Sequence, residues 1–476
     1  MAWHSPHKER TGRGPLIALV AGGVAVLLLT LHYLFSTDST VLETASARLS
    51  SLVSTSFTSS TCGANDELIR EYGGTNIKLS RVHEGSGFRV QRFLEKLENG
   101  ESVKVAVVGG SVSNGHGTDE RGNRYQYGAI KQTWHSYVSS WLNETYGPTE
   151  FVNGAKAATD SSFFRFCWSE RVRLAERAPD LVLIELDVNN INDDESRDST
   201  EIMLRSILQL PNQPAVMFVG SFALTSQTGD GGMTNGGDAH MALSSFYDVP
   251  QISIRNPLLP ALFHNSSLAQ PYFKGDPRHI AAPLHRFLGD MVIAYLQEQR
   301  CSALSMKGGE PEGELWPNST FLGAVPARRL TDAWDSTVVH PSAPPTCSIA
   351  GSSFSSAYQD PSWTLWSWKN TKTYVMTAKA DQRIEFDVEV PQGGEGVVGV
   401  GYLRSNSPSY KLGKLVCRVG EQETELDGYW QREVSLTATT VVASGLSPGP
   451  YRLVCSTAAG RQPDWTAFRL ASIVSA

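Results

Sequence analysis

Residues 103–117 read VKVAVVGGSVSNGHG, a stretch in which an apolar run is followed by a turn rich in glycine. Its first six positions form an almost unbroken apolar run, which is typical of a strand buried on both faces of a parallel sheet. Two glycines then end the strand, and Ser111 follows directly. Because a backbone of glycines does not block an approaching substrate, the stretch predicts a serine nucleophile on a tight turn at the sheet edge.

The same glycines raise the alternative of a nucleotide-binding loop. A Rossmann loop requires G-x-G-x-x-G, a spacing that these glycines do not have. Gly110 and Gly115 do have the spacing of a phosphate-binding loop, but His116 and Gly117 then stand where Lys and Ser or Thr would hold phosphate and metal. The stretch therefore favours a nucleophile over a nucleotide.

Strand and helix patterns alternate from this stretch to residue 297. Apolar strand runs recur at 180–186 and 214–221, and helical spacing occurs at 125–142 and 287–297. This alternation predicts a parallel sheet covered by helices on both faces. Because sites in such sheets form at the carboxyl ends of the strands, the polar residues after each strand are the candidates.

Three further segments place suitable groups at such ends. Asn153 and Gly154 end a short apolar run in a turn of small residues, and Asn189 follows the strand at 180–186. Asp276 precedes His279 by three residues, a spacing at which a carboxylate can accept from Nδ1 and leave Nε2 free to take a serine proton.

In this order the segments resemble the four sequence blocks of the SGNH (GDSL-type) esterase and acyltransferase superfamily. The blocks lie at Gly110–Gly115, Asn153–Thr159, Asn189 and Asp276–His279. The resemblance implies a three-layer α/β/α domain and a triad of Ser111, His279 and Asp276. It also implies no metal and no organic cofactor.

The resemblance further implies an oxyanion hole made of the Ser111 N–H, the Asn189 amide and one backbone N–H of the second block. We assign that last donor to Gly154, with Ala157 and Ala158 as alternatives. Gly110 stands where the superfamily usually has an acidic residue, which is not a member of the triad.

Other residues near these blocks have structural interpretations. His285 is an alternative base, and His116 is expected at the rim of the site. Glu185 and Asp187 share a strand face with Asn189, and one of them is expected to hydrogen-bond the loops of the site. A tryptophan cluster could stack on sugars or pack as core; its members are Trp363, Trp366 and Trp368.

The carboxyl-terminal part has a different pattern. Residues 301–345 are rich in Pro, Gly, Ser and Glu and are expected to form a linker, and residues 346–476 an antiparallel β-sandwich. Its short strand runs lie at 384–390, 397–405, 414–420, 439–445, 451–457 and 468–474. Cys417 and Cys455 lie on two of them and could pair. This part resembles the sandwich of membrane-anchored eukaryotic SGNH proteins.

The amino terminus predicts a membrane anchor. Residues 15–35 are 21 uncharged residues, which as a helix span about 30 Å, one hydrocarbon core. Basic residues within 1–14 precede them, so this tail is expected in the cytosol and the bulk of the chain in the lumen. In the alternative, a cleaved signal peptide, the apolar core would be shorter.

A stem is expected at 36–64, because 15 of the 26 residues at 36–61 are Ser or Thr. The α/β domain is then expected at 65–300. Three N-glycosylation sequons, at Asn143, Asn265 and Asn318, fit a lumenal chain in the Golgi, the endoplasmic reticulum or at the cell surface.

Composition excludes other classes. The net charge of −7 disfavours nucleic acid as a partner, since phosphate backbones require a surplus of Lys and Arg. The six cysteines form no C-x-x-C pair, which disfavours a thiolate zinc site.

The sequence thus predicts a serine-dependent carbohydrate esterase or O-acyltransferase that acts on glycans in the secretory pathway. The alternative is a catalytically inactive glycan-binding or scaffold protein that keeps the fold.

Overall fold

The computed structural model describes residues 65–118, 132–225, 232–274, 276–306, 323–338, 340–341, 343–368, 372–432 and 434–476. These belong to one compact unit, Gly63–Ala476, separate from residues 1–62. The expected anchor, most of the expected stem and the sequon at Asn318 lie outside the described residues. Within the described part of the chain, no helix combines the length and apolar character of a membrane span.

A six-stranded sheet forms the centre of the first domain, in the order β1-β6-β5-β4-β2-β3. Strands β2 to β6 pair in parallel, and β1 is an antiparallel edge strand. The strands are β1 (Arg81–His83), β2 (Lys104–Gly109), β3 (Glu150–Asn153), β4 (Leu181–Glu185), β5 (Ala215–Gly220) and β6 (Gln251–Ser253). Both faces of β2 are buried, which explains its almost continuous apolar sequence.

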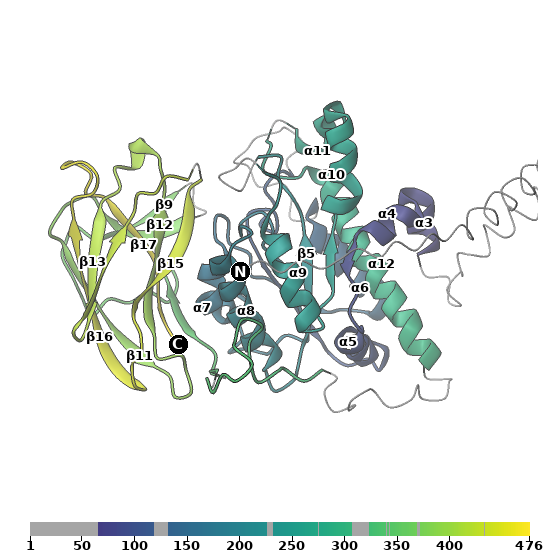
Figure 1. Ribbon diagram of the computed structural model, residues 1–476, viewed down its shortest axis with the longest axis horizontal. Coiled ribbons are helices and arrows are strands. Elements are labelled where there is room, and N and C mark those ends of the chain that lie inside the picture. Colours follow the sequence, from purple (N-terminus) through teal and green to yellow (C-terminus); the bar gives the residue numbers. More distant parts are fainter. Residues whose placement is uncertain are drawn as a thin grey trace, which may run out of the picture. The chain divides into compact units, whose positions relative to one another are not determined.

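Helices cover both faces of this sheet (Figure 1). One face packs against α5 (Phe88–Glu98), α6 (Trp134–Tyr146) and α12 (Ala282–Met306), and the other against α7 (Ser161–Arg171), α8 (Asp194–Leu208) and α9 (Gly236–Phe246). The remaining helices are α3 (Asp66–Tyr72), α4 (Gly74–Leu79), α10 (Arg255–His264), η2 (Ser266–Ala269) and α11 (Gln270–Phe273). The predicted α/β domain with a parallel sheet is confirmed.

Two antiparallel sheets form the second domain. One has the order β15-β12-β17-β10-β9, with β7 also paired to β17, and the other β14-β13-β16-β11-β8. The first sheet contains β7 (Thr346–Ile349), β9 (Thr364–Trp368), β10 (Lys372–Thr377), β12 (Val398–Arg404), β15 (Leu436–Ala443) and β17 (Phe468–Ser475). The second contains β8 (Tyr358–Gln359), β11 (Arg383–Val390), β13 (Lys414–Val419), β14 (Gln422–Asp427) and β16 (Gly449–Ala458); a short η4 (Pro408–Tyr410) follows β12.

The core of the sandwich lies between the sheets and contains the disulfide Cys417–Cys455, which joins cross-strand neighbours on β13 and β16. The predicted second, antiparallel β domain is thus confirmed. Each of the six predicted strand runs corresponds to an observed strand, whereas β7 to β10 and β14 are additional.

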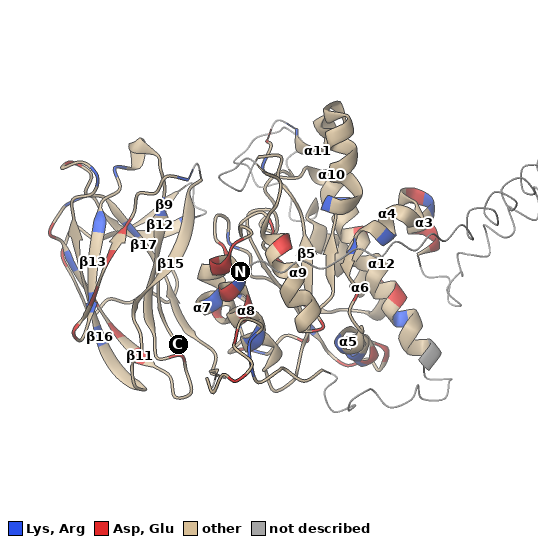
Figure 2. Ribbon diagram, viewed as in Figure 1, with Lys and Arg blue, Asp and Glu red and all other residues tan. Residues whose placement is uncertain are grey.

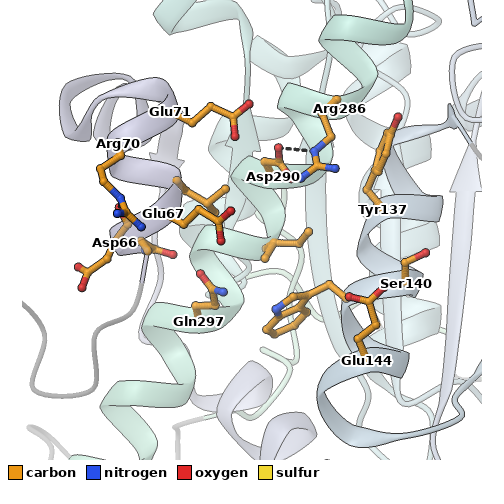
Figure 3. Close-up of a pocket in the computed structure, with 14 residues that line it drawn as sticks. Asp66, Glu67, Arg70, Glu71, Tyr137, Ser140, Glu144, Arg286, Asp290 and Gln297 are labelled. Carbon is orange, nitrogen blue, oxygen red and sulfur yellow. Dashed lines mark hydrogen bonds and ion pairs between the residues drawn. The ribbon is translucent and has the colours of Figure 1, made fainter.

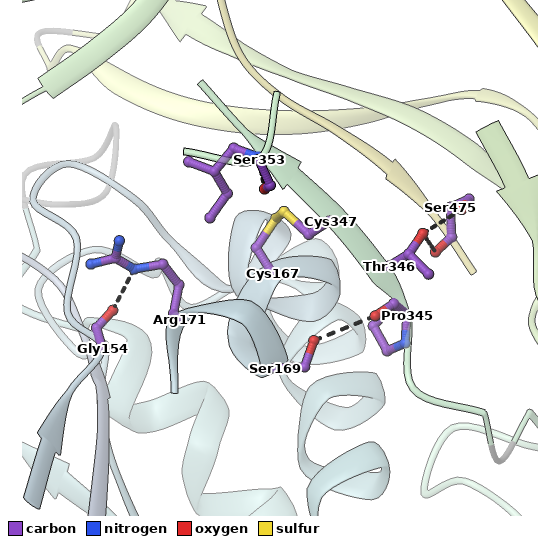
Figure 4. Close-up of a disulfide and its surroundings, with 10 residues drawn as sticks. Gly154, Cys167, Ser169, Arg171, Pro345, Thr346, Cys347, Ser353 and Ser475 are labelled. Atoms are coloured by element: carbon purple, nitrogen blue, oxygen red, sulfur yellow. Dashed lines mark hydrogen bonds between the residues drawn. A yellow bond between two sulfur atoms is a disulfide. The ribbon is translucent and has the colours of Figure 1, made fainter. Parts of the chain in front are cut away.

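A second disulfide joins the two domains. Cys167 on α7 is bonded to Cys347 on β7, and next to it the Ser169 hydroxyl donates to the Pro345 carbonyl at 3.4 Å (Figure 4). Arg165 on α7 also pairs with Glu395 of the sandwich. Helix α7 therefore carries the docking surface for the second domain.

Part of the expected linker packs on the first domain. The guanidinium of Arg205 on α8 donates to the carbonyl oxygens of Pro326 and Arg328 at 2.8 and 3.1 Å. Residues 323–338 therefore lie against α8, and residues 307–322 are outside the described part.

Candidate active site

Ser111, His279 and Asp276 lie together in one hydrogen-bonded chain. Nε2 of His279 is 2.8 Å from Oγ of Ser111, and its Nδ1 is 2.8 Å from Oδ2 of Asp276. The other oxygen of Asp276 accepts the backbone N–H of Arg278 at 3.0 Å, which fixes the carboxylate. This geometry lets the imidazole take the serine proton while the carboxylate orients the ring.

The two loops that carry these residues are in tight contact. A Cβ added to Gly117 would lie 2.2 Å from the carbonyl oxygen of Ile280, the residue after His279. Gly117 also has a φ of +88°, in the region that favours glycine. The turn after β2 can therefore approach the His279 loop closely only because position 117 has no side chain.

Buried polar groups hydrogen-bond the turn after β2 that carries Ser111 (the serine turn). The Glu185 carboxylate accepts from the N–H and the hydroxyl of Ser113, at 3.2 and 2.8 Å, and from the Ser221 hydroxyl at 3.1 Å. The Trp134 indole donates to the same Ser113 hydroxyl at 3.0 Å. Complete burial raises the pKa of Glu185 to about 8.

Asn153 and His135 contact the same turn at Ser113. The Asn153 amide and His135 Nε2 both lie within hydrogen-bond distance of the Ser113 carbonyl oxygen, at 3.0 and 2.9 Å. Burial lowers the pKa of His135 to about 4, so its ring is neutral at pH 7. The roles of His135, Ser113 and Trp134 could not be predicted from the sequence, because they depend on contacts between distant segments.

Asn189 lies against the serine turn. A Cβ on Gly110 would be 1.8 Å from Oδ1 of Asn189, so any larger residue there requires the Asn189 side chain to move. This contact gives the physical reason for the departure at position 110, where an acidic side chain would displace Asn189. Among the described residues nothing hydrogen-bonds the Asn189 side chain, and its Oδ1 is buried. Its amide is therefore free to contact a substrate.

Gly154 is not available as an oxyanion donor, which corrects the assignment made from the sequence. Its N–H donates to the Val107 carbonyl at 2.9 Å, as part of the β2–β3 pairing. The next two N–H groups are also engaged, Ala155 with Asn153 Oδ1 at 3.0 Å and Lys156 with Gly109 O at 2.9 Å.

The N–H groups of Ala157 and Ala158 donate to no described residue. Ala158 has a φ of +57°, the left-handed conformation that glycine adopts most easily. The oxyanion loop, residues 155–159, thus offers its free donors at Ala157 and Ala158. We assign the second-block donor to this part of the loop.

The competing histidines have other roles. His285 is buried, accepts the Trp134 N–H at 3.2 Å through Nδ1, and has a pKa lowered to about 3 by desolvation. The His116 ring is 4.9 Å from that of His279, and burial, followed by the charges of His279 and Lys372, lowers its pKa to about 3. Neither ring lies in the Ser111 hydrogen-bond chain.

Asp187 does not reach Ser111 either. Its carboxylate is 3.0 Å from Nδ1 of His240, and the opposite nitrogen of that ring is 3.0 Å from the Asn190 amide. Both side chains are almost fully buried. This second acid–histidine pair therefore stabilises the turn after β4.

A cavity of about 480 Å³ lies away from this site, between α3, α6 and α12 (Figure 3). Its walls are charged: α3 carries Asp66, Glu67 and Glu71, and Figure 2 shows acidic residues on that helix. On α12, Arg286 pairs with Asp290 at 2.6 Å. The cavity contains no member of the Ser111 chain, so we place the chemistry at Ser111 and not here.

Solved structures support the same architecture. A two-domain esterase (CEX) active on acetylated mannans, co-crystallised with mannopentaose, matches with a TM-score of 0.59 and 15% identity over 84% of this chain and 97% of that chain. A second structure of that esterase matches with a TM-score of 0.58 and 15% identity over 84% and 98% of the two chains. The chain has the SGNH hydrolase fold with a β-sandwich domain.

At 15% sequence identity, these matches show only that the fold is shared. No protein-family model and no curated protein sequence matches the chain. The function must therefore be argued from the site.

Proposed function

We propose that this protein is a serine-dependent carbohydrate esterase or O-acyltransferase, with Ser111, His279 and Asp276 as its triad. The observation that carries the proposal is the chain of two 2.8 Å contacts from Ser111 Oγ through His279 to Asp276. Nucleophile, base and orienting acid stand in the order that acyl transfer requires. The mannan esterase with the same two-domain fold supports an acylated glycan as the substrate.

In the first half-reaction Ser111 Oγ attacks the ester carbonyl while His279 Nε2 takes the serine proton. The negative charge on the tetrahedral oxygen is met by the Ser111 N–H, the Asn189 amide and a free N–H of the oxyanion loop. When the intermediate collapses, His279 returns the proton to the leaving sugar oxygen and the acyl group remains on Ser111. Each preorganised donor is worth about 3 kcal/mol.

In the second half-reaction an acceptor hydroxyl gives its proton to His279 and attacks the acyl-serine; the bond from the acyl carbon to Ser111 Oγ then breaks, and His279 returns the proton to Oγ. Water as acceptor makes the protein an esterase, and a sugar hydroxyl makes it an acyltransferase. We further propose that the reaction takes place in the lumen of the secretory pathway, with residues 15–35 as the membrane anchor and glycans on Asn143 and Asn265, both of which are exposed.

The full-length chain with ¹³C-acetylated oligosaccharides tests this proposal. We expect labelled acetate in the absence of an acceptor, and NMR shows whether added unacetylated oligosaccharide receives the label instead. The control is Ser111→Ala, which should release and transfer nothing. If wild type is as inert as this variant, the fold serves only binding or scaffolding.

A further inference from the structure

Aromatic and cationic side chains cluster on one face of the sandwich. On β9 and β10, Trp368 lies opposite Lys372 and Trp366 opposite Tyr374. On the next strand pair, Arg469 of β17 lies opposite Met376, two positions beyond Tyr374. Because residues two apart on a strand share a face, these side chains project from the same side of the sheet. We call them the cationic face: Trp366, Trp368, Lys372, Tyr374 and Arg469.

The cationic face adjoins the oxyanion loop. The Tyr374 hydroxyl lies 3.1 Å from Oγ1 of Thr437, and the Thr437 N–H donates to the Ala158 carbonyl at 2.7 Å. At the other end, the charge of Lys372 adds to burial and the charge of His279 in lowering the pKa of His116, whose ring lies 4.9 Å from that of His279. A sugar chain with its ester at Ser111 would thus continue onto the sandwich.

Arg469 is a buried cation with unsatisfied donors. Its residue is 8% exposed, and its Nε and Nη1 have no hydrogen-bond partner among the described residues. The guanidinium lies between the rings of Trp366 and Tyr410, 4.6 and 4.5 Å from their centres. Buried donors without partners are costly, and an anion would satisfy them.

Closer to the nucleophile, two lysines also lie beside aromatic rings. Lys156 lies in the oxyanion loop with its ammonium 5.0 Å from the Phe163 ring, and Lys372 lies 5.4 Å from the Trp368 ring. Neither pairs with a carboxylate among the described residues. Desolvation, followed by the charges of Arg171 and Lys372, lowers the pKa of Lys156 to about 7, and desolvation lowers the pKa of Lys372 to about 8. In a chain of net charge −7, such a concentration of uncompensated cations is suited to a negative ligand.

We propose that the sandwich completes the substrate site, and that Lys372, Lys156 and Arg469 bind anionic groups along the sugar chain whose ester Ser111 attacks. The chemistry that fits is a carboxylate or sulfate: a guanidinium and two ammonium groups donate to such oxygens, and the flanking aromatic rings pack against sugar faces. The substrate is then an acidic glycan. This inference rests on the proposed function.

The test compares one acetylated glucuronic-acid oligosaccharide with the same oligosaccharide after its carboxyl groups are reduced to alcohols. With the full-length chain we expect kcat/KM to be at least about tenfold higher for the acidic form, which corresponds to one partly desolvated ion pair. A third arm, the reduced oligosaccharide carrying sulfate, distinguishes carboxylate recognition from general anion recognition.

Lys372→Gln should reduce the preference for the acidic over the reduced substrate several-fold, mainly through KM. Lys379→Gln, an exposed lysine of the same domain, is the matched control and should keep the wild-type preference. Arg469→Gln should also lower the preference; if it does not fold, the Lys372 variant still decides.

Hydrolysis of p-nitrophenyl acetate by wild type separates the two proposals. If wild type cleaves this small ester but treats acidic and reduced oligosaccharides alike, or if Lys372→Gln keeps the full preference, the anionic-substrate inference is overturned and the proposed function stands. If the small ester is not cleaved and no oligosaccharide is deacetylated, the proposed function itself fails.

Discussion

The backbone N–H of Thr437 donates to the carbonyl oxygen of Ala158 at 2.7 Å, so the second domain holds the oxyanion loop of the first. Thr439, two residues further on the same strand, donates its N–H to the Ser162 hydroxyl at 3.2 Å. Because β15 is an edge strand, its outward N–H groups are free for this docking. The sandwich therefore helps to hold the loop at residues 155–159 in place.

Thr437→Pro should loosen the oxyanion loop. Proline removes the N–H that Ala158 accepts, and an edge strand tolerates its lack of a donor. A hydrogen bond of this kind is worth about 1 kcal/mol, so we expect kcat on a small ester to fall roughly 5- to 10-fold with little change in thermal midpoint. Thr439→Pro, which loses the bond to Ser162 instead, is the matched control and should retain more activity. Equal kcat in the two variants would argue against a role for the Ala158 contact.

Asn189→Ala should lower kcat about 10²-fold with little change in KM, because its amide contacts charge that develops only in the transition state. Steady-state kinetics on an acetyl ester measures this. Gly110→Ala should lower kcat similarly, since the added methyl group must displace the Asn189 side chain. An unchanged kcat for Asn189→Ala would remove this residue from the oxyanion hole.

Glu185 should make the folded protein less stable as the pH rises. Its pKa is about 8 when folded and near its ordinary value of about 4.5 when unfolded, so the unfolded chain releases this proton first. Stability from this group is complete below pH 4.5 and is lost as the pH rises to about 8, a change on the order of 4 kcal/mol.

Glu185→Gln should therefore flatten the decline of the unfolding free energy between pH 5 and 8, as followed by urea denaturation. Glu176→Gln, at an exposed position, should leave the decline as it is in wild type. If Glu185→Gln shows the wild-type slope, the carboxyl group is not held protonated by burial.

Asp276→Asn should retain the fold but lose about 10³- to 10⁴-fold in kcat. The NH2 group of the asparagine can donate to Nδ1 of His279, which holds the imidazole in the tautomer with its proton on Nε2, so Nε2 would present a proton to Ser111 instead of a lone pair. Kinetics together with circular dichroism checks both parts. Near-normal turnover would mean that Asp276 does not orient His279.

The proximity of Ser111, His279 and Asp276 could be predicted because each lies in a short local pattern: Ser111 in a glycine turn after a buried strand, and Asp276 and His279 three residues apart. The second-block donor could not. Whether the Gly154 N–H is free depends on the pairing of β2 with β3, which consumes it, and local sequence does not record that pairing. The α/β pattern and six sandwich strands were evident from periodicity.

The strands β9 and β10 were missed because TLWSW and KTYVMT lack clean alternation of apolar and polar residues. On β10 the pattern is irregular because Tyr374, on the cationic face, and Val375, on the opposite face, are both buried. The side chains of the cationic face, which obscure the strand pattern, are also those that we propose to bind the acidic glycan. Trp363 is buried, whereas Trp366 flanks Arg469, so the tryptophan cluster divides between core and surface roles.

The most direct test of the account is covalent labelling of Ser111. The full-length chain is treated with a fluorophosphonate, and the modified residue is located by mass spectrometry in wild type, His279→Ala and His285→Ala. We predict that wild type and His285→Ala are labelled at Ser111, and that His279→Ala is labelled far more slowly because no base activates the hydroxyl. Labelling that fails at Ser111 in wild type, or that depends on His285 and not on His279, would contradict the account.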